Sequence, residues 1–320
     1  MSIIDSLSVG FHTVTKRIWL ILVPVVLDVY LWLGPRLSIA PVIQRLLPLF
    51  TVPPEVGADY QQMMIQNREL LEEMAQSVNL TSLLSTGVPT LMTGATPQAT
   101  FLHTAPVVWE GRSLWVYGAV ISVLWLAGLL VGSLYLAAVG QSVHAEEPYS
   151  SDSSGGFLSR AWVAWTWLTL LTVLVGVLSI TITLPLSLIL GLLAMLSMNL
   201  AIIGMTMLTG IALWVGFYMV FVIPSIVMNR IGAWRAIWNS LNVVSRNFWA
   251  TLGLVALSLF INFGFSTIWQ QMRTGSSLTF VAIVGNAYIG TGLTAAMFAF
   301  YCSRYALWQK TMTGSPPGGD

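Results

Sequence analysis

Asp28 is the side chain best suited to intramembrane chemistry, because it lies inside an apolar run that is long enough to cross a bilayer. An ionised carboxylate costs at least about 2.5 kcal/mol at mid-membrane, so such residues mark either a functional site or a buried pair. Asp28 could therefore serve as a proton or cation site. Alternatively, it could be paired with a polar group on a neighbouring helix, or reach the interface near Arg36. The sequence leaves both interpretations open.

Three amide side chains lie in other apolar runs and are candidate partners of Asp28, namely Asn199, Asn262 and Asn286. Catalytic signatures are missing: the sequence has no phosphate-binding glycine motif, no His-Glu-x-x-His zinc helix and no Gly-x-Ser-x-Gly turn. There is a single cysteine, and the three histidines all lie outside the apolar runs, so the sequence gives no basis for a metal or haem site. We therefore predict no catalytic residue, no metal and no cofactor.

The composition places these residues in an integral membrane protein. Only 8% of the 320 residues are charged, against about 25% in an average soluble domain, and 56% are hydrophobic. The mean hydropathy is +0.80. A net charge of +1 argues against a nucleic-acid partner, which needs a strong basic patch. The predicted fold class is all-α, a polytopic membrane protein.

Six apolar stretches are predicted to span the membrane within a single domain, 1–320. They cover about 18–34, 115–139, 162–190, 200–228, 250–269 and 278–303. The stretch 161–229 contains no charged residue or histidine and could hold two or three helices, with breaks expected near Pro185 or Ser197. We choose two, because Arg160 and the basic segment that follows 229 then share one face. The first span could also be a cleaved signal peptide, but Asp28 interrupts its apolar core.

Basic residues set the predicted orientation, with both termini in the cytoplasm of a bacterial cell and the spans in its inner membrane. Four spans begin with an arginine followed by a tryptophan, a pattern typical of anchors at the headgroup level. These anchors are Arg17 with Trp19, Arg112 with Trp115, Arg160 with Trp162, and Arg246 with Trp249. Gly128 and Gly132, four residues apart, predict close packing between helices.

Two amphipathic segments are predicted to lie at the interface, over 2–16 and 230–246. In the second, Trp234 and Trp238 belong to the apolar stripe and Asn239 to the polar face. The segment 35–113 should form an extracytoplasmic loop, with one amphipathic helix over 55–79 and an ordered cap of turns over 80–106. The tail 313–320 is predicted to be disordered.

The region 221–249 has a proline near the end of an apolar run, then an amphipathic stretch with Ser240, then an aromatic entry into the next span. It reads Phe221-Val222-Ile223-Pro224-Ser225-Ile226-Val227, Gly232-Ala233-Trp234-Arg235-Ala236-Ile237-Trp238-Asn239-Ser240-Leu241 and Arg246-Asn247-Phe248-Trp249. This pattern resembles bacterial six-helix membrane proteins of unknown function, which are similar to the membrane domain of some glycerophosphodiester phosphodiesterases. Where that family usually has an acid after the proline, this chain has Asn229.

The row 32–36, Trp-Leu-Gly-Pro-Arg, also resembles uncharacterised membrane proteins of Chloroflexi-type bacteria. No part of the chain matches the phosphodiesterase catalytic domain, so the resemblance implies no catalytic residue. The leading predicted function is a non-enzymatic scaffold, assembly or regulatory module, with lipid binding as one way in which it could act. The alternative is a small transporter or channel that uses Asp28 and the intramembrane amides, and a membrane enzyme ranks third. The predicted partners are the lipid bilayer and other membrane protein subunits.

Overall fold

A computed structural model describes residues 2–47, 62, 65–66, 68–73, 78–94, 108–109, 114–145, 156–272 and 278–313. Over these residues the protein is all-α, as predicted, and five of its helices are long and apolar enough to cross a membrane. A shorter apolar helix covers Ile18–Leu33. The chain is therefore a multi-pass membrane protein.

Helices make up almost all of the regular structure. In chain order they are α1 (Ile3–Lys16), η1 (Ile18–Ile21), α2 (Leu22–Leu33), α3 (Ala40–Leu46), η3 (Leu80–Ser85), η4 (Met92–Gly94), α5 (Leu114–His144), α6 (Phe157–Leu196), α7 (Met198–Tyr218), α8 (Val222–Asn229), α9 (Ala233–Arg246), α10 (Phe248–Met272) and α11 (Leu278–Thr313). Two-residue strands β1 (Arg36–Leu37) and β2 (Val108–Trp109) pair in parallel. The packing divides the chain into two compact units, which are described separately.

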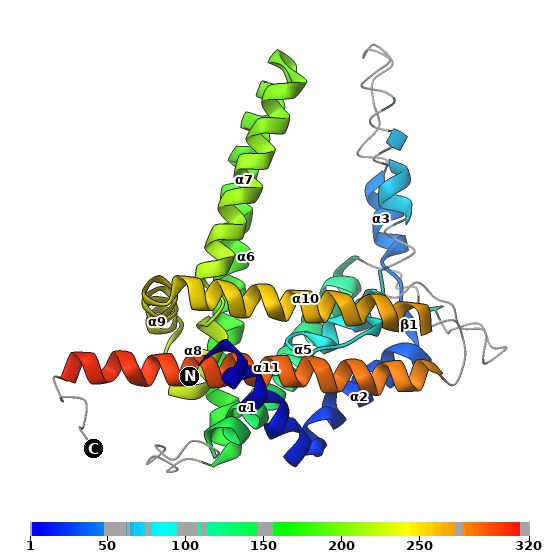
Figure 1. The fold of residues 1–320 in the computed structure, drawn as a ribbon. Coiled ribbons are helices and arrows are strands. Elements are labelled where there is room, and N and C mark those ends of the chain that lie inside the picture. The colour runs from blue at the N-terminus through cyan, green and yellow to red at the C-terminus, as the bar shows by residue number, and fades with distance from the viewer. Residues whose placement is uncertain are drawn as a thin grey trace, which may run out of the picture. The chain divides into compact units, whose positions relative to one another are not determined.

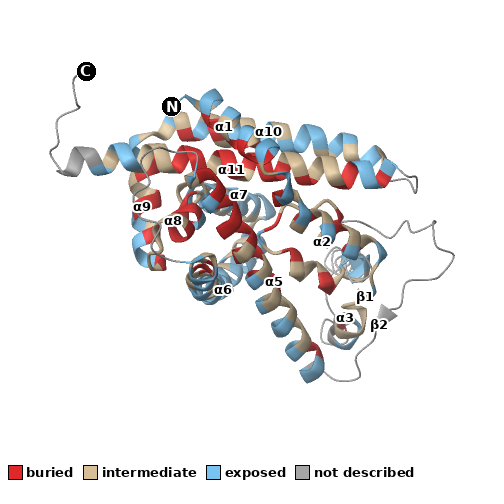
Figure 2. Ribbon diagram, turned by 90° about the horizontal axis from the view of Figure 1, so that it is seen from below, coloured by how far each residue is buried: buried red, intermediate tan, exposed pale blue. Residues whose placement is uncertain are grey.

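The first unit contains residues 1–16, 136–258 and 292–320. Two of its helices, α6 and α7, pack side by side as a hairpin (Figure 1). The break between them falls at Ser197, one of the two predicted places, whereas Pro185 stays inside α6. The two helices are mostly exposed, in contrast to the buried α8 (Figure 2). The uncharged stretch therefore forms two long helices and the short α8.

A polar junction joins α7, α8 and α9 in the region that carries the family resemblance. Pro224 has no N–H to donate, and the chain leaves α7 at Tyr218 before α8 begins. Ser240 of α9 bonds to the backbone between the two helices: its hydroxyl accepts from the N–H of Phe221 (3.1 Å) and donates to the carbonyl of Tyr218 (2.6 Å). Asn229, at the end of α8, donates to the Tyr301 hydroxyl at 2.7 Å.

The amphipathic helix α9 packs on the protein through a face of small and polar residues. Asn239, assigned to the polar face, is buried and donates to Ser225 Oγ at 3.4 Å. Trp234 and Trp238, assigned to the apolar stripe, are both exposed. Small residues such as Ala236 and Ser240 face inward instead, because they let α9 approach α8 closely. The exposed tryptophan side chains are therefore available to lie at the level of the lipid headgroups.

The N-terminal helix α1 begins with a capping box, in which Ser2 Oγ accepts from the Asp5 N–H (3.1 Å) and the Asp5 carboxylate accepts from the Ser2 N–H (2.7 Å). This N–H holds the pKa of the Asp5 carboxyl below its ordinary value. A Cβ at Gly10 would meet the backbone of α11 at Gly292 and Ala296. The predicted interfacial helix is therefore docked on α11.

The second unit contains residues 17–135 and 259–291. Helix α2 leads into β1, which places Arg36 opposite Val108 and thus brings the end of α2 near the start of α5. One hydrophobic cluster joins Leu31 of α2, Met92 of η4 and Ile283 of α11. The predicted helix over 55–79 lies mostly outside the described residues. Those described between 62 and 73 are helical, with an ion pair from Arg68 Nε to Glu72 Oε1 at 3.0 Å.

Candidate functional site

Asp28 lies on α2, fully buried, and accepts hydrogen bonds from backbone N–H groups of the loop that follows η3. Its Oδ1 accepts from Leu91 N (2.9 Å) and Met92 N (2.8 Å), and its Oδ2 accepts from Leu91 N (2.9 Å). These N–H groups lie at the start of η4, where a helical turn leaves its first donors without carbonyl partners. The carboxylate therefore caps η4 and fixes it to α2. The structure thus shows Asp28 in a buried polar pairing, with backbone donors of residues 91 and 92.

The segment that Asp28 holds, residues 79–94, is irregular and satisfies its own backbone with short polar side chains. We call it the inserted segment. Asn79 Oδ1 accepts from Thr81 N (3.2 Å) and Leu37 N (3.1 Å), which starts η3. Ser85 donates to the carbonyl of Ser82 at 2.7 Å. Ser, Thr and Asn favour such local bonds, which compete with regular helix.

The inserted segment contacts two long helices far from their ends. On α5, a Cβ at Gly128 would collide with the carbonyl oxygen of Leu83, and a Cβ at Gly132 with that of Thr86. On α11, a Cβ at Gly290 would collide with Pro89. Gly128 is about 21 Å along α5 from Leu114, and Gly290 is about 18 Å along α11 from Leu278, at 1.5 Å per residue. The hydrocarbon core of a bilayer is about 30 Å thick. The contacts therefore fall near the middle of these apolar helices.

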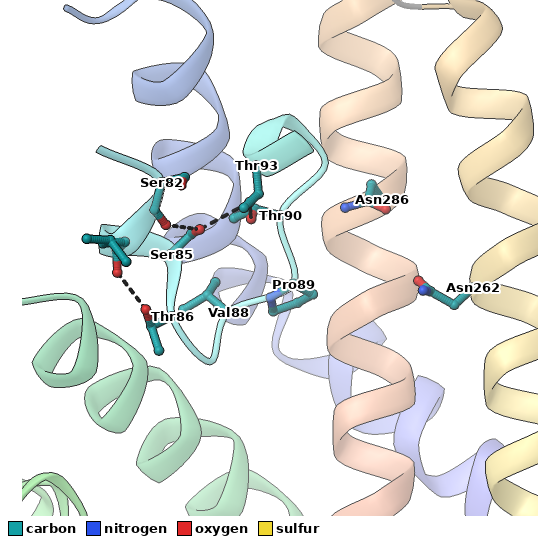
Figure 3. Close-up of a pocket in the computed structure, with 10 residues that line it drawn as sticks. Ser82, Ser85, Thr86, Val88, Pro89, Thr90, Thr93, Asn262 and Asn286 are labelled. Atoms are coloured by element: carbon teal, nitrogen blue, oxygen red, sulfur yellow. Dashed lines mark hydrogen bonds between the residues drawn. The ribbon is translucent and has the colours of Figure 1, made fainter. Parts of the chain in front are cut away.

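A pocket of about 480 Å³ lies between the inserted segment and the facing helices α10 and α11 (Figure 3). The inserted segment contributes hydroxyl-bearing and apolar residues, and the helices contribute one amide each. The lining residues are Ser82, Leu83, Ser85, Thr86, Val88, Pro89, Thr90, Thr93, Asn262 and Asn286. Its volume is within the range of about 300–1,000 Å³ that is usual for small-molecule sites.

The pocket presents hydrogen-bonding groups that carry no charge. None of its lining residues is charged. A hydroxyl can both donate and accept a hydrogen bond, and an amide offers two donors and an acceptor. Figure 3 draws hydrogen bonds among the residues of the inserted segment, such as Ser85 with Thr93, but none that joins the other lining residues to Asn262 or Asn286. Both amides can therefore hydrogen-bond to a ligand without breaking a bond to the opposite wall.

The structure brings two of the four polar candidates together and separates the other two from them. Asn262 and Asn286 line the pocket, from α10 and α11. Asp28 is not among the lining residues and serves the segment that forms one wall. Asn199 is exposed on α7, in the other unit. Within the described ranges, no group of three His, Cys, Asp or Glu side chains could hold a metal ion.

The hydroxyl groups of the pocket were not among the residues predicted from the sequence. The sequence predicts a cap of turns over 80–106 and helix packing at Gly128 and Gly132, whereas the structure places the backbone of the inserted segment against this glycine pair. The available signal was the combination of the glycine pair with a short stretch that is rich in Ser and Thr. Close approach to glycine is available to any backbone, irregular as well as helical.

In each of the four predicted interfacial anchors, the tryptophan side chain is exposed. Trp19, Trp115, Trp162 and Trp249 all lie on the surface. Arg17 and Arg160 are half-buried, and Arg246 is exposed. Arg112 lies outside the described residues.

Comparisons of this chain with models of protein families, with curated proteins and with solved structures give no match.

Proposed function

We propose that this protein is a non-enzymatic integral membrane protein, a scaffold or regulatory module that responds to an uncharged, hydroxyl-bearing ligand. The observation that carries the proposal is the pocket of hydroxyls and amides beside the inserted segment. Irregular backbone at membrane depth is tolerated only where protein buries it or where it lines a polar cavity. A segment whose fixation uses a buried carboxylate and three close glycine contacts is costly to keep, which favours a binding role for it.

The absence of charge on the lining selects the ligand. A phosphate or carboxylate ligand would lose its hydration on binding and would find no cationic side chain in the pocket. Burying an unpaired charge in this way is strongly unfavourable. A ligand with several neutral hydroxyl groups, such as a sugar or a polyol, loses less on desolvation and can bond to both amides. Asn286 of α11 is the most direct probe, because it is half-buried and faces the hydroxyls of the inserted segment (Figure 3).

The test is a binding measurement on purified protein in nanodiscs, against a panel of methyl β-glucoside, glycerol and a glycosyl diacylglycerol. We expect at least one member to raise the apparent Tm, and the substitution Asn286→Leu to remove that rise. Asn199→Leu is the matched control, since Asn199 is an exposed amide on α7 outside the pocket. If no member of the panel binds, or if binding survives Asn286→Leu, the proposal fails.

A small transporter or channel is the second candidate, and the inserted segment favours it because irregular backbone at membrane depth also occurs in conduction pathways. The pathway would use Asn262 and Asn286 and a neutral solute, with Asp28 holding the wall in place. Stopped-flow swelling of liposomes with glycerol distinguishes the two. Fast swelling that is lost in Asn286→Leu would favour transport, and no swelling above that of empty liposomes would favour the binding module.

The proposed location is a bacterial inner membrane, with both termini in the cytoplasm and residues 35–113 outside. The support is the basic segment 230–246, which carries Arg230, Arg235 and Arg246 without an acid. A C-terminal green fluorescent protein fusion should fluoresce, whereas an alkaline phosphatase fusion at the same place should be inactive. The reverse result would invert the topology. The resemblance to the membrane domain of glycerophosphodiester phosphodiesterases agrees with a module that lacks its own catalytic site.

A further inference from the structure

The pocket borders a surface of α10 that carries large exposed apolar side chains. Phe260 and Phe263, on either side of Asn262 in the chain, have exposed fractions of 77% and 75%. In a membrane-spanning helix such side chains face lipid. Asn262 is itself exposed although it lines the pocket, so one wall of the pocket belongs to the surface that α10 presents to the bilayer. A ligand can therefore reach the pocket sideways, from the lipid.

A polar stripe on α10 leads to this opening. Asn262, Ser266 and Gln270 follow one another at steps of four residues, which puts them on the same side of the helix. Gln270 is exposed and lies two residues before the end of α10 at Met272, and Ser266 is half-buried. The stripe covers about 12 Å along the axis, at 1.5 Å per residue, from the helix end to the pocket.

This stripe is unfavourable against hydrocarbon. Ser266 donates to the carbonyl of Phe263 at 3.0 Å, so its proton is satisfied within the helix and its oxygen remains an acceptor. Asn262 and Gln270 each carry an amide with two donors and an acceptor, and among the described residues neither has a hydrogen-bond partner. Polar groups in apolar surroundings require a hydrogen-bonding partner. A lipid whose headgroup lies along the stripe supplies that partner while its chains cover the phenylalanines.

We infer that the ligand of the pocket is a lipid with an uncharged, hydroxyl-rich headgroup, of the glycosyl diacylglycerol class, which enters sideways along the stripe Asn262, Ser266 and Gln270. The lipid comes from the leaflet at the face where α10 ends and α11 begins. This inference rests on the proposed function, because it assigns a ligand to the same pocket. A soluble sugar has the same headgroup chemistry, but it does not need a polar route through a lipid-facing surface.

Photo-crosslinking in nanodiscs tests the inference, with a glycosyl diacylglycerol that carries a diazirine in one acyl chain. Phosphatidylcholine with the same photoreactive chain is the comparison lipid. We expect the glycosyl lipid to label α10 more strongly than phosphatidylcholine does. Gln270→Leu should lower its labelling by about five-fold, which is the loss expected for one hydrogen bond between neutral groups. Thr267→Val is the matched control, since Thr267 is the exposed polar residue next to the stripe on the same helix.

The result separates this inference from the function on which it rests. If methyl β-glucoside binds and Gln270→Leu leaves lipid labelling unchanged, the pocket takes a soluble ligand, and the inference is wrong while the proposed function stands. Equal labelling by phosphatidylcholine would also overturn the inference, because the headgroup would then make no difference. If no member of the panel binds, glycerol included, the proposed function fails as well.

Discussion

The carboxylate of Asp28 accepts hydrogen bonds from two consecutive backbone N–H groups, those of Leu91 and Met92. The sequence identified Asp28 because an acid inside an apolar run is conspicuous. It pointed to the amides as partners, since side chains are all that a sequence displays. Backbone N–H groups occur at almost every position and leave no pattern, so the true partner could not be predicted. The same limit applies to Ser240, whose hydroxyl bonds to backbone groups of Tyr218 and Phe221.

Replacing Asp28 by Asn should lower the free energy of unfolding by about 2 kcal/mol, since hydrogen bonds to a charged group contribute about 1.5–3 kcal/mol. The amide retains one acceptor oxygen but turns an NH₂ group toward the backbone donors. Unfolding in detergent, followed by circular dichroism, measures the change. Glu72→Gln is the control, because Glu72 is an exposed carboxylate in an i,i+4 pair with Arg68 and should change stability little. Unchanged stability of Asp28→Asn would contradict a structural role.

The long helices were predictable as elements and the inserted segment was not. Spans follow from the length and hydrophobicity of apolar runs. Five of the six predicted regions hold a helix long enough to cross a membrane, and the first holds the shorter apolar helix Ile18–Leu33. The inserted segment is short, mixed in polarity and held by contacts between residues far apart in the chain. Leu83 meets Gly128, and Pro89 meets Gly290. Its position depends on backbone shape and on the absence of Cβ atoms, which hydropathy does not register. The pocket was consequently predictable only through its two amides.

The substitution Gly128→Ala should displace the inserted segment, because the new Cβ would collide with the carbonyl oxygen of Leu83. The expected result is faster maleimide labelling of a cysteine introduced by Thr90→Cys, in a protein that also carries Cys302→Ser. Binding to the pocket should fall in parallel. Gly118→Ala is the control on the same helix, since a Cβ there meets open space. Equal labelling rates in the two variants would show that the segment is not fixed by close approach to α5.

At the scale of the whole molecule, the surface is largely apolar where the surface of a soluble protein would be charged. Exposed leucine, isoleucine, valine and methionine side chains are concentrated on α6 and α7, and neither helix contributes a buried residue between 169 and 218. Such a surface is stable only in contact with lipid or with another apolar surface. The hairpin of α6 and α7 therefore offers a large apolar surface to the bilayer or to a second subunit.

The substitution Leu188→Arg should reduce the fraction of protein recovered in the membrane. Leu188 is 71% exposed on α6, and a central arginine costs about 2.5–3.5 kcal/mol on insertion scales. The measurement is the ratio of membrane-integrated to total protein after expression, and Leu188→Phe, which keeps the position apolar, is the control. Normal integration of Leu188→Arg would mean that this part of the hairpin faces water.

The contacts of the inserted segment also set an order for biogenesis. Asp28 is synthesised before the segment and α5 soon after it, but Gly290 follows Pro89 by roughly 200 residues. At about 5–20 residues per second, the ribosome needs roughly 10–40 s to reach it. During these seconds the inserted segment and its polar side chains have been synthesised, but the wall of the cavity that α11 forms has not. Helix α11, which is made well after the inserted segment, thus completes the cavity, and a chain truncated before α11 would hold Asp28 and the segment without a complete pocket.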